Sequence, residues 1–324
     1  MSTDGSEEAS GALESEAPEP PEAKQSDSYR DAGARGYSFD PVAVPADYPI
    51  VEAFGYPPDA ETAEAESARQ RCWCPFMDQP CTKLISPART GICSIRYRAE
   101  GFAETNWAVC QHRLKGAPFR EAVSRHFGSR ARDASLVTEL RLDKPRMSLD
   151  GVGAVVEDEE VKDLVGIEAQ TIDTRGGSLK PLWESFASGR PDRWRDGYPG
   201  GPKFGVNTTN VWKRLLPQVM NKGRLYRGWD SKLYVVVQDP VFQFITRRMP
   251  LERLPRQSAG QAEIVWLLWD FVEGGLRDPE TGMLLAEVAE AVYTTIDQVE
   301  DAFVSIAFTP KNEFLKRLLK KLER

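Results

Sequence analysis

The stretch Val165-Gly166-Ile167-Glu168-Ala169-Gln170-Thr171 has the alternating character of a β-strand, and it predicts a strand over residues 164–172. Side chains along a strand repeat with a period of two, so Glu168 and Gln170 are expected on the same face. A second strand is predicted over residues 148–156, and the acidic run between the two strands indicates a solvated turn. The two strands are therefore expected to form a β-hairpin or to lie as neighbours in one sheet.

Asp150 lies on the earlier of these strands, upstream of Glu168 in the pattern D-x17-E-x-Q. An Asp on one strand followed by Glu-x-Lys on the next resembles the layout of nucleases with the PD-(D/E)xK core. In those nucleases two carboxylates hold a divalent metal that activates water. The third position here is Gln170, which can form hydrogen bonds but cannot act as a base. The competing interpretation is that acids beside a hairpin turn are simply solvated.

The flanking sequence predicts an α/β fold with a mixed sheet in the middle and helices around it. Residues 232–237 form an apolar run that is typical of a strand in a sheet covered on both faces. Residues 134–142 fit either a helix end or a strand. Helical spacing, capping residues and prolines predict helices over residues 117–127, 207–216, 241–249, 261–273, 284–293 and from Asn312 onward.

The five cysteines are confined to one short segment of the chain. Four thiolates satisfy a tetrahedral cation, so a structural metal held by sulfur is one explanation of this clustering. Iron and zinc both accept four sulfurs, and the C-x-C pair leaves open which of its two members is a ligand. A group of buried free thiols is the other explanation. The cysteines are Cys72, Cys74, Cys81, Cys93 and Cys110.

Charge is unevenly distributed along the chain, whose formal net charge is −7. Residues 1–30 hold eight acids and two bases, and residues 1–45 together are expected to be a disordered acidic tail. Residues 175–256 hold sixteen Lys or Arg and six Asp or Glu, with interleaved Trp and Tyr. A basic, aromatic-rich stretch can neutralise phosphates and reach the bases of nucleic acid. The alternative is an ordinary solvated surface balanced by acids elsewhere in the fold.

No apolar run approaches the roughly 20 residues that a membrane helix needs, and the best one, Val265–Trp269, is followed by Asp270. The acidic N-terminus has no apolar h-region, so neither a signal peptide nor a disulfide framework is expected. We therefore expect a cytoplasmic protein with no membrane partner. The 2 histidines leave little room for a His-based metal site or a Ser-His-Asp relay.

Several short motifs follow one another in a set order: Cys74-Pro75-Phe76, Pro80-Cys81-Thr82-Lys83, Gly91-Ile92-Cys93, Trp107-Ala108-Val109-Cys110, Ser148-Leu149-Asp150, Gly166-Ile167-Glu168-Ala169-Gln170-Thr171 and Asn210-Val211-Trp212-Lys213-Arg214. In that order they resemble the NotI-type restriction endonucleases. The resemblance implies a PD-(D/E)xK nuclease fold, an iron held by four cysteines, and Mg²⁺-dependent type II cleavage of double-stranded DNA. It also implies a homodimer acting at a long palindromic site, with a cognate DNA methyltransferase as a possible partner.

Carried onto this chain, the resemblance implies one extra cysteine, Cys72, beside four that hold the iron. The acidic tail and the C-terminal third do not match the family. We expect the chain to divide into the acidic tail over 1–45, a metal-binding segment over 46–115, a nuclease core over 116–260 and a helical C-terminal region over 261–324. The four implied iron ligands are Cys74, Cys81, Cys93 and Cys110.

The resemblance further implies a catalytic set of Asp150, Glu168 and Gln170, with Mg²⁺ at the two carboxylates. Gln170 in place of Lys is then a feature shared with the family. Glu139 lies where a further upstream acid of the metal site could stand.

Lys213, Arg214 and Arg175 are the candidate DNA contacts, because Arg side chains can pair with phosphates or read guanine edges in the major groove. A solvated helix face is the alternative for the first two. The alternative function is a DNA-binding module without cleavage, in which the four-cysteine site is only a structural support. That function needs the basic stretch and the cysteines but not the carboxylates.

Overall fold

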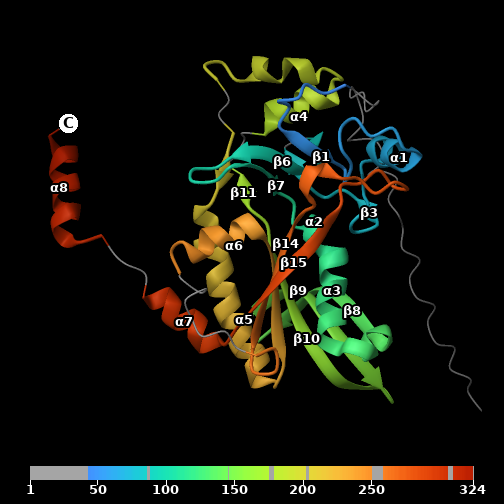
Figure 1. Cartoon of the computed structure of the whole chain (residues 1–324), viewed down its shortest axis with the longest axis vertical. Helices are drawn as coiled ribbons and strands as arrows, with labels where there is room; N and C mark the ends of the chain where they lie inside the picture. The colour runs from blue at the N-terminus through green and yellow to red at the C-terminus, as the bar shows by residue number, and fades with distance from the viewer. Residues whose placement is uncertain are drawn as a thin grey trace, which may run out of the picture. The chain divides into compact units, whose positions relative to one another are not determined.

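A six-stranded mixed sheet forms the core of the computed structural model, in the order β15-β14-β13-β10-β9-β8 (Figure 1). β13 pairs in parallel with both β10 and β14, and the remaining neighbours are antiparallel. The predicted α/β class with a mixed central sheet is therefore confirmed. The strands are β8 (Ala134–Asp143), β9 (Arg146–Glu157), β10 (Glu160–Gln170), β13 (Lys232–Gln238), β14 (Ile264–Phe271) and β15 (Ala286–Thr294).

The residues that the structure describes all lie within the unit Gly36–Arg324. They are residues 43–85, 88–144, 146–174, 179–201, 204–249, 258–305 and 309–323. Nearly all of the predicted acidic tail lies outside the described residues, and so does Arg175, so what the sequence predicts for them stays a prediction.

β9 and β10 form the predicted hairpin. Glu157 pairs with Glu160, which leaves Asp158 and Glu159 as a two-residue turn. Both turn residues have positive φ, 52° and 63°, as the tight turns of hairpins require. A β-bulge at Lys162 then adds one residue on the β10 side. Turn and bulge together fix the register, and a slip of one residue would move every side chain to the opposite face.

Helices cover both faces of the sheet, with α5 and α6 on one side and α3 on the other (Figure 1). Alternate residues of β13 therefore enter two cores: Val235 packs with α5, α6 and α7, and Val236 packs with α3. The helix predicted over 117–127 is confirmed with the same bounds, and the apolar run at 232–237 is the buried strand that was predicted. The helices are α3 (Ala117–Phe127), α5 (Leu216–Gly228), α6 (Asp239–Thr246) and α7 (Ile296–Val304).

The helix predicted over 207–216 has different bounds in the structure. A π-helical turn, Val211–Leu215, leads directly into α5, which continues to Gly228. Pro217 lies in the first turn of α5, but the helix reaches it from the π-helical turn, so its missing N–H leaves a gap in the intrahelical hydrogen bonds. The proline therefore marks the change from π-helical to α-helical bonding, and the helix does not end there.

A smaller three-stranded sheet, in the order β1-β6-β7, carries the cysteine segment. Its strands are antiparallel. None of the helices in the described ranges has both the length and the apolar character that crossing a bilayer demands. The remaining elements are β1 (Ile50–Ala53), α1 (Ala63–Arg71), β2 (Trp73–Cys74), β3 (Gln79–Pro80), β4 (Leu84–Ile85), β5 (Ala88–Arg89), β6 (Ile92–Arg98), β7 (Glu104–Ala108), α2 (His112–Lys115), β11 (Asp173–Thr174), α4 (Lys180–Ala187), β12 (Val206–Asn207) and α8 (Lys311–Leu322), with 3₁₀ turns at Gly128–Asp133, Pro191–Gly197 and Glu273–Gly275.

The prediction of a wholly helical C-terminal region is wrong, because 261–273 and 284–293 largely form β14 and β15. Residues 264–269 are apolar and buried on both faces, and such a run does not distinguish a buried strand from a buried helix. The second segment is rich in Ala and Glu, which favour helices, but pairing with β14 overrides that preference. Among the described residues of this region, α7 and α8 are the α-helices, and α8 agrees with the helix predicted from Asn312.

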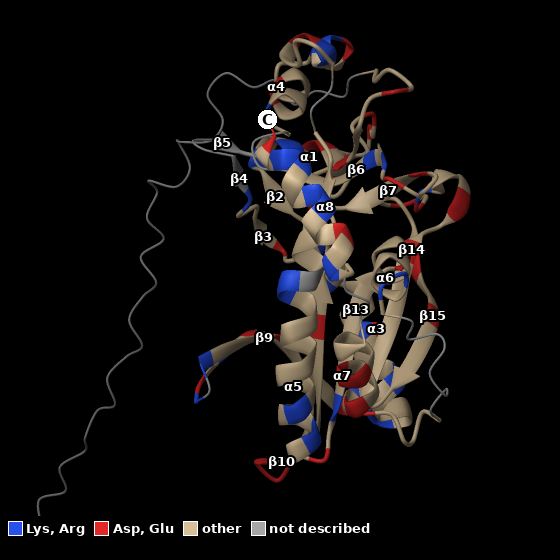
Figure 2. Cartoon of the chain, turned by 90° about the vertical axis from the view of Figure 1, so that its left-hand side faces the viewer, with Lys and Arg blue, Asp and Glu red and all other residues tan. Residues whose placement is uncertain are grey.

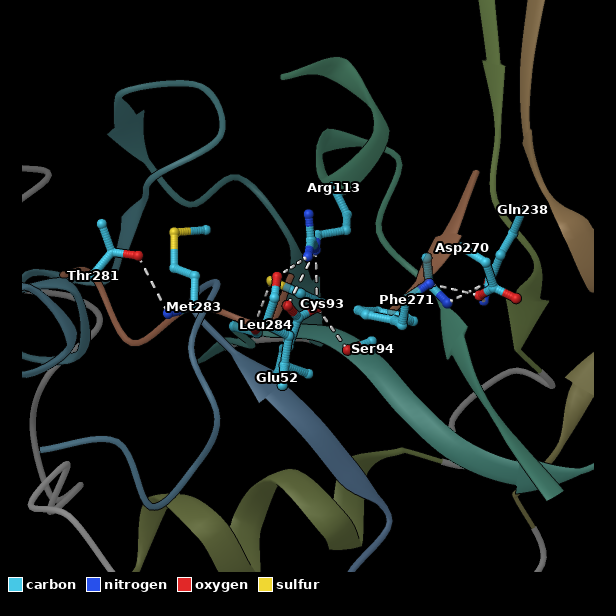
Figure 3. Close-up of polar contacts among 12 residues, drawn as sticks. Glu52, Cys93, Ser94, Arg113, Gln238, Asp270, Phe271, Thr281, Met283 and Leu284 are labelled. Atoms are coloured by element: carbon cyan, nitrogen blue, oxygen red, sulfur yellow. Dashed lines mark hydrogen bonds and ion pairs between the residues drawn. The ribbon is translucent and has the colours of Figure 1, made fainter. Parts of the chain in front are cut away.

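Gln238, at the end of β13, joins the small sheet to the large one. Its amide oxygen accepts a hydrogen bond from the backbone N–H of Ala108 at 2.9 Å, and its amide nitrogen donates to the carbonyl of Asn106. The same nitrogen donates to Asp270 on β14 at 2.8 Å (Figure 3). A single buried amide thus ties β7 to the ends of β13 and β14, which positions the cysteine segment at the carboxyl end of these parallel strands.

A buried ion pair between Arg113 of α2 and Glu52 of β1 makes the second connection between the small sheet and the large one (Figure 3). Nε of Arg113 donates to both carboxylate oxygens of Glu52 at 3.1 Å, and its Nη2 donates to the carbonyl of Leu284 at 2.9 Å. The Ser94 hydroxyl donates to the same carboxylate at 2.7 Å. The carboxylate of Glu52 is completely buried, and burial raises its pKa although Arg113 and Ser94 oppose that shift.

We expect Arg113→Met to lower the free energy of unfolding by about 3–5 kcal/mol, because it leaves the Glu52 charge buried without its partner. Urea denaturation measures the change. The double variant Glu52→Gln/Arg113→Met should recover a large part of the loss, since no charge is then stranded. As a control, Arg125→Met removes the exposed pair with Glu121 and should cost less than about 0.5 kcal/mol. Equal costs for the two single variants would contradict this account.

Candidate active site

The register of the large sheet places three acids in one row. Gly151 pairs with Ile167, so the next position along the hairpin sets Asp150 opposite Glu168. On the other side of β9, the flanking pairs of β8 set Glu139 opposite Asp150. The backbone N–H of the residue after Glu168 donates to the Asp150 carboxylate at 3.0 Å, which holds the two acidic side chains at the same end of the hairpin.

Glu168 is the most perturbed acid of this row. It is 2% exposed, and its pKa is raised to about 7, first by burial and then by the neighbouring charge of Asp150. Lys222 of α5 opposes that shift, because its ammonium donates directly to the Glu168 carboxylate. Glu168 therefore lies between a like charge on the next strand and a buried cation on the covering helix.

The close approach of α5 to β10 explains this contact. The Tyr226 ring lies over Gly166, and a Cβ added there would come within 2.1 Å of the ring. Lys222 is one helical turn before Tyr226, and Glu168 is two residues after Gly166. One turn rises about 5.4 Å and two strand residues span about 6.7 Å, so Lys222 meets Glu168 when Tyr226 meets Gly166.

A cavity of about 610 Å³ opens beside these residues. One wall comes from β9 and β10, a second from the helical segment at α5, and a third from the cysteine segment. The lining includes Asp150, Glu168 and Gln170 on the first wall, Arg214, Gln218 and Lys222 on the second, and Lys83, Cys110 and His112 on the third. Three distant parts of the sequence therefore meet at one polar cleft.

Gln170 lies in the cleft as its position two residues beyond Glu168 predicts. Its side-chain amide donates to the carbonyl of Thr171 at 2.7 Å. The side chain is thus on the predicted face and can serve as a hydrogen-bonding group, but it supplies no charge to the cleft.

Glu139 shares the row but not the cleft. Its φ is +59°, and its carboxylate binds Nζ of Lys115 at 2.7 Å. That contact lowers the pKa of Glu139. The structure therefore brings Asp150 and Glu168 together and holds the Glu139 carboxylate on a different partner. Within the described residues, no group of three or more His, Cys, Asp or Glu side chains is already arranged to hold a metal ion.

Of the predicted DNA contacts, Arg214 lines the cleft and Lys213 is exposed outside its lining. Nη1 of Arg214 lies 3.4 Å from the carboxylate of Asp173, which also accepts a hydrogen bond from Asn210 at 2.7 Å. Arg175 is outside the described residues.

Lys and Arg recur along α5 (Figure 2), but several of them have acidic partners outside the cleft. Arg224 and Arg227 pair with Glu300 and Asp297 of α7. Some cations of the basic stretch therefore balance acids on the surface, and Arg214 and Lys222 face the cleft. Nucleic-acid binding by this stretch stays a prediction.

Four of the five cysteines influence one another electrostatically. Burial raises the pKa of Cys81 to about 11, and charges on Cys110 and Cys74 add to the shift. The pKa of Cys93 is also raised, by burial and then by Cys110, Cys81 and Cys74 among its neighbours. These are the four positions that the resemblance implies as ligands. Thiols are the donors that a thiophilic cation prefers, and these four influence one another's pKa, but within the described residues no three of them are arranged to hold a metal ion.

Lys83 connects the cysteine segment to the cleft. Its ammonium donates to the carbonyls of Ile92 at 3.1 Å and Val109 at 2.8 Å, each next to one of the cysteines. Cys110 is half-buried and lines the cleft, and His112, two residues further on, lies with Nδ1 3.9 Å from Sγ of Cys74. Cys110 therefore contributes to the third wall of the cleft, and Cys74, Cys81 and Cys93 do not line it.

A family model described as restriction endonuclease NotI matches residues 202–280. The match spans α5, β13, α6 and β14, a minority of the 324 residues, and it supports similarity to NotI-type restriction endonucleases. None of the curated proteins compared with the chain matches it. The matched region contributes Arg214, Gln218 and Lys222 to the cleft, whereas the acids and the cysteines lie outside it.

Lys222 is the residue of this site that sequence reasoning missed. A pattern in the sequence could have revealed it, because Leu215, Val219, Lys222 and Tyr226 follow the spacing of one buried helix face. A lysine in such a stripe is exceptional, since lysines are almost never fully buried unless they are paired.

We expect Gly166→Ala to lower the free energy of unfolding by about 1–3 kcal/mol, because the new methyl group would overlap the Tyr226 ring. Gly228→Ala is the matched control at the end of α5, where a Cβ has no described atom within 4 Å. It should change the stability by less than about 0.5 kcal/mol. Chemical denaturation of both variants checks the difference, and a neutral Gly166→Ala would contradict the close packing of α5 on β10.

Proposed function

We propose that this protein is a type II restriction endonuclease that hydrolyses phosphodiester bonds of double-stranded DNA at a palindromic site, with Mg²⁺ as its cofactor. One observation carries the proposal: the region that matches the NotI family model meets the acids of β9 and β10 across a single cleft, through Lys222 and Glu168. The pairing of Asp150 with Glu168 also favours a nuclease over a DNA-binding module without cleavage, which needs no such pair.

The hairpin and its partner strand support a PD-(D/E)xK core. Asp150 and Glu168 provide carboxylate oxygens, the donors that Mg²⁺ prefers. A bound Mg²⁺ would lower the pKa of a coordinated water and neutralise charge on the phosphate. Asp150 is oriented by the N–H of Ala169, and Gln170 lies where it can orient water by hydrogen bonds. The Glu139 carboxylate is paired with Lys115 and does not line the cleft, so we assign Glu139 no direct role in catalysis.

The neighbouring cysteines support a structural iron or zinc site in the same proposal, because Cys74, Cys81, Cys93 and Cys110 lie close enough to influence one another's pKa. Cys74, Cys81, Cys93 and Cys110 would hold the metal, and Cys72 would be the extra cysteine. The bound metal would cross-link a segment in which β2, β3, β4 and β5 have two residues each. Because Cys110 and Lys83 line the cleft, such a site would also brace its third wall.

The substrate and assembly follow from the same assignment. Arg214 at the cleft mouth, with Lys213 and Arg175, would contact DNA phosphates or guanine edges. A palindromic site has two-fold symmetry, and a homodimer of this chain would match it. A cognate DNA methyltransferase would protect the host's own sites.

We expect the purified protein with Mg²⁺ to convert genomic DNA into discrete fragments, and sequencing of their ends gives the site and the stagger. Glu168→Ala should lower the cleavage rate by more than about 100-fold, because even outer-shell partners of metal ligands cost 10- to 100-fold. Glu160→Ala is the control, since this acid of the same strand is exposed and pairs only with Lys162 among the described residues. Unchanged cutting by Glu168→Ala would exclude the assigned site.

Metal analysis tests the cysteine assignment independently of cleavage. We expect about one iron or zinc per chain, and Cys81→Ser or Cys93→Ser should lose it together with much of the thermal stability. Cys72→Ser should keep the metal. The backbone of Cys72 closes α1, with its N–H bonded to the carbonyls of Ala68 and Arg69, and the substitution leaves that backbone in place. Loss of metal from Cys72→Ser and its retention in Cys81→Ser would reverse the assignment.

A further inference from the structure

We propose that Lys222 of α5 takes the place of the lysine that β10 lacks at Gln170, and that its ammonium binds the scissile phosphate group in the cleft. The inference deepens the proposed function and rests on it. The residue comes from a helix more than fifty positions along the chain from the strand it serves, so no motif of spaced residues on β10 contains it.

The burial of Lys222 is the first argument. Its side chain is 6% exposed and stands on the same face of α5 as the buried Val219 and Tyr226. Removing an ammonium and a carboxylate from water is costly, and replacing a buried pair by apolar residues is often neutral or stabilising. Stability alone therefore gives no reason to keep a lysine here.

The hydrogen bonds of the ammonium are the second argument. Nζ of lysine carries three N–H donors, and Glu168 is the acceptor recorded for it among the described residues. Lys222 lines the cleft beside Glu168 and Gln170, so its remaining donors have access to an anionic oxygen that enters there. A phosphodiester oxygen is an acceptor of the required charge.

The position of the charge is the third argument. Gln170 contributes a neutral amide that donates to Thr171, so β10 brings no cation to the cleft. The packing of Tyr226 on Gly166 aligns α5 with β10 and places Lys222 at Glu168, and Gln218, one turn further along, lines the cleft with Gln170. The helix thus delivers a lysine to the end of the strand where the motif would otherwise place one.

A second cavity supports the path of the substrate. It measures about 530 Å³ and shares Gln218 and Lys222 with the cleft, and it is also lined by Asn221 and Arg224. Lys222 therefore lines two open spaces along α5, and a nucleic acid strand that follows the helix would pass its side chain.

The experiment compares the single variant Lys222→Met with the double variant Gln170→Lys/Lys222→Met, in which the lysine is moved from the helix to the strand. We call this double variant the relocated pair. Single-turnover cleavage in Mg²⁺, DNA binding in Ca²⁺ and thermal stability are measured for each. We expect Lys222→Met to keep DNA affinity within about threefold and to lose about 10²–10³-fold in cleavage rate, the effect of removing one oriented donor. The relocated pair should regain at least about tenfold in rate, because the charge is restored from the strand side.

Lys180→Met is the control, since this exposed lysine of α4 pairs with Glu184 away from the cleft and should leave cleavage unchanged. Cleavage by Lys222→Met within about threefold of the unmodified chain overturns the inference. If that single variant does not fold, the relocated pair decides: a folded pair that binds DNA but shows no recovered cleavage also overturns it. Failure of the unmodified chain to cut DNA would instead contradict the proposed function itself.

Discussion

The contact between Tyr226 and Gly166 is the constraint on which the cleft depends. It lets α5 lie so close to β10 that residues one turn apart on the helix meet residues two apart on the strand. Glu168 then contacts Lys222 of the covering helix and lies beside Asp150 of the neighbouring strand. Its pKa is raised to about 7 by burial and by the Asp150 carboxylate. A side chain larger than hydrogen at position 166 would push α5 away from β10 and separate Lys222 from Glu168. The geometry of the site therefore depends on a glycine in the middle of the strand.

The sequence predicted the parts of this arrangement that depend on local periodicity. The alternation in β10 placed Glu168 and Gln170 on one face, and the acidic turn fixed β9 and Asp150 beside it. It did not predict β14, because a fully apolar run has no period that separates a buried strand from a buried helix. Nor did it assign Lys222 to the site, since the partner of a helical residue depends on packing between distant elements, although the lysine interrupts an otherwise apolar stripe.

The cysteine segment reaches the same cleft through a different set of forces. Gln238 fastens the end of β7 to β13 and β14, and Lys83 fastens the loops that hold two of the cysteines. β2, β3, β4 and β5 of this segment have two residues each, so a metal held by thiolates would cross-link elements that pair over a very short length. The sulfur set and the acids are thus proposed to serve one cleft, one by holding its wall and the other by doing its chemistry.

A sequence motif and the site that it describes can differ in the residue that supplies the positive charge. A motif of the form Glu-x-Lys records where the lysine is attached, but the chemistry depends only on where the ammonium lies. Gln170 and Lys222 line one cleft from opposite elements, so a charge absent from the strand is available from the helix. Such an exchange is possible only where helix and strand are held in fixed register. The close packing at Gly166 and the proposed role of Lys222 are therefore two consequences of the same contact.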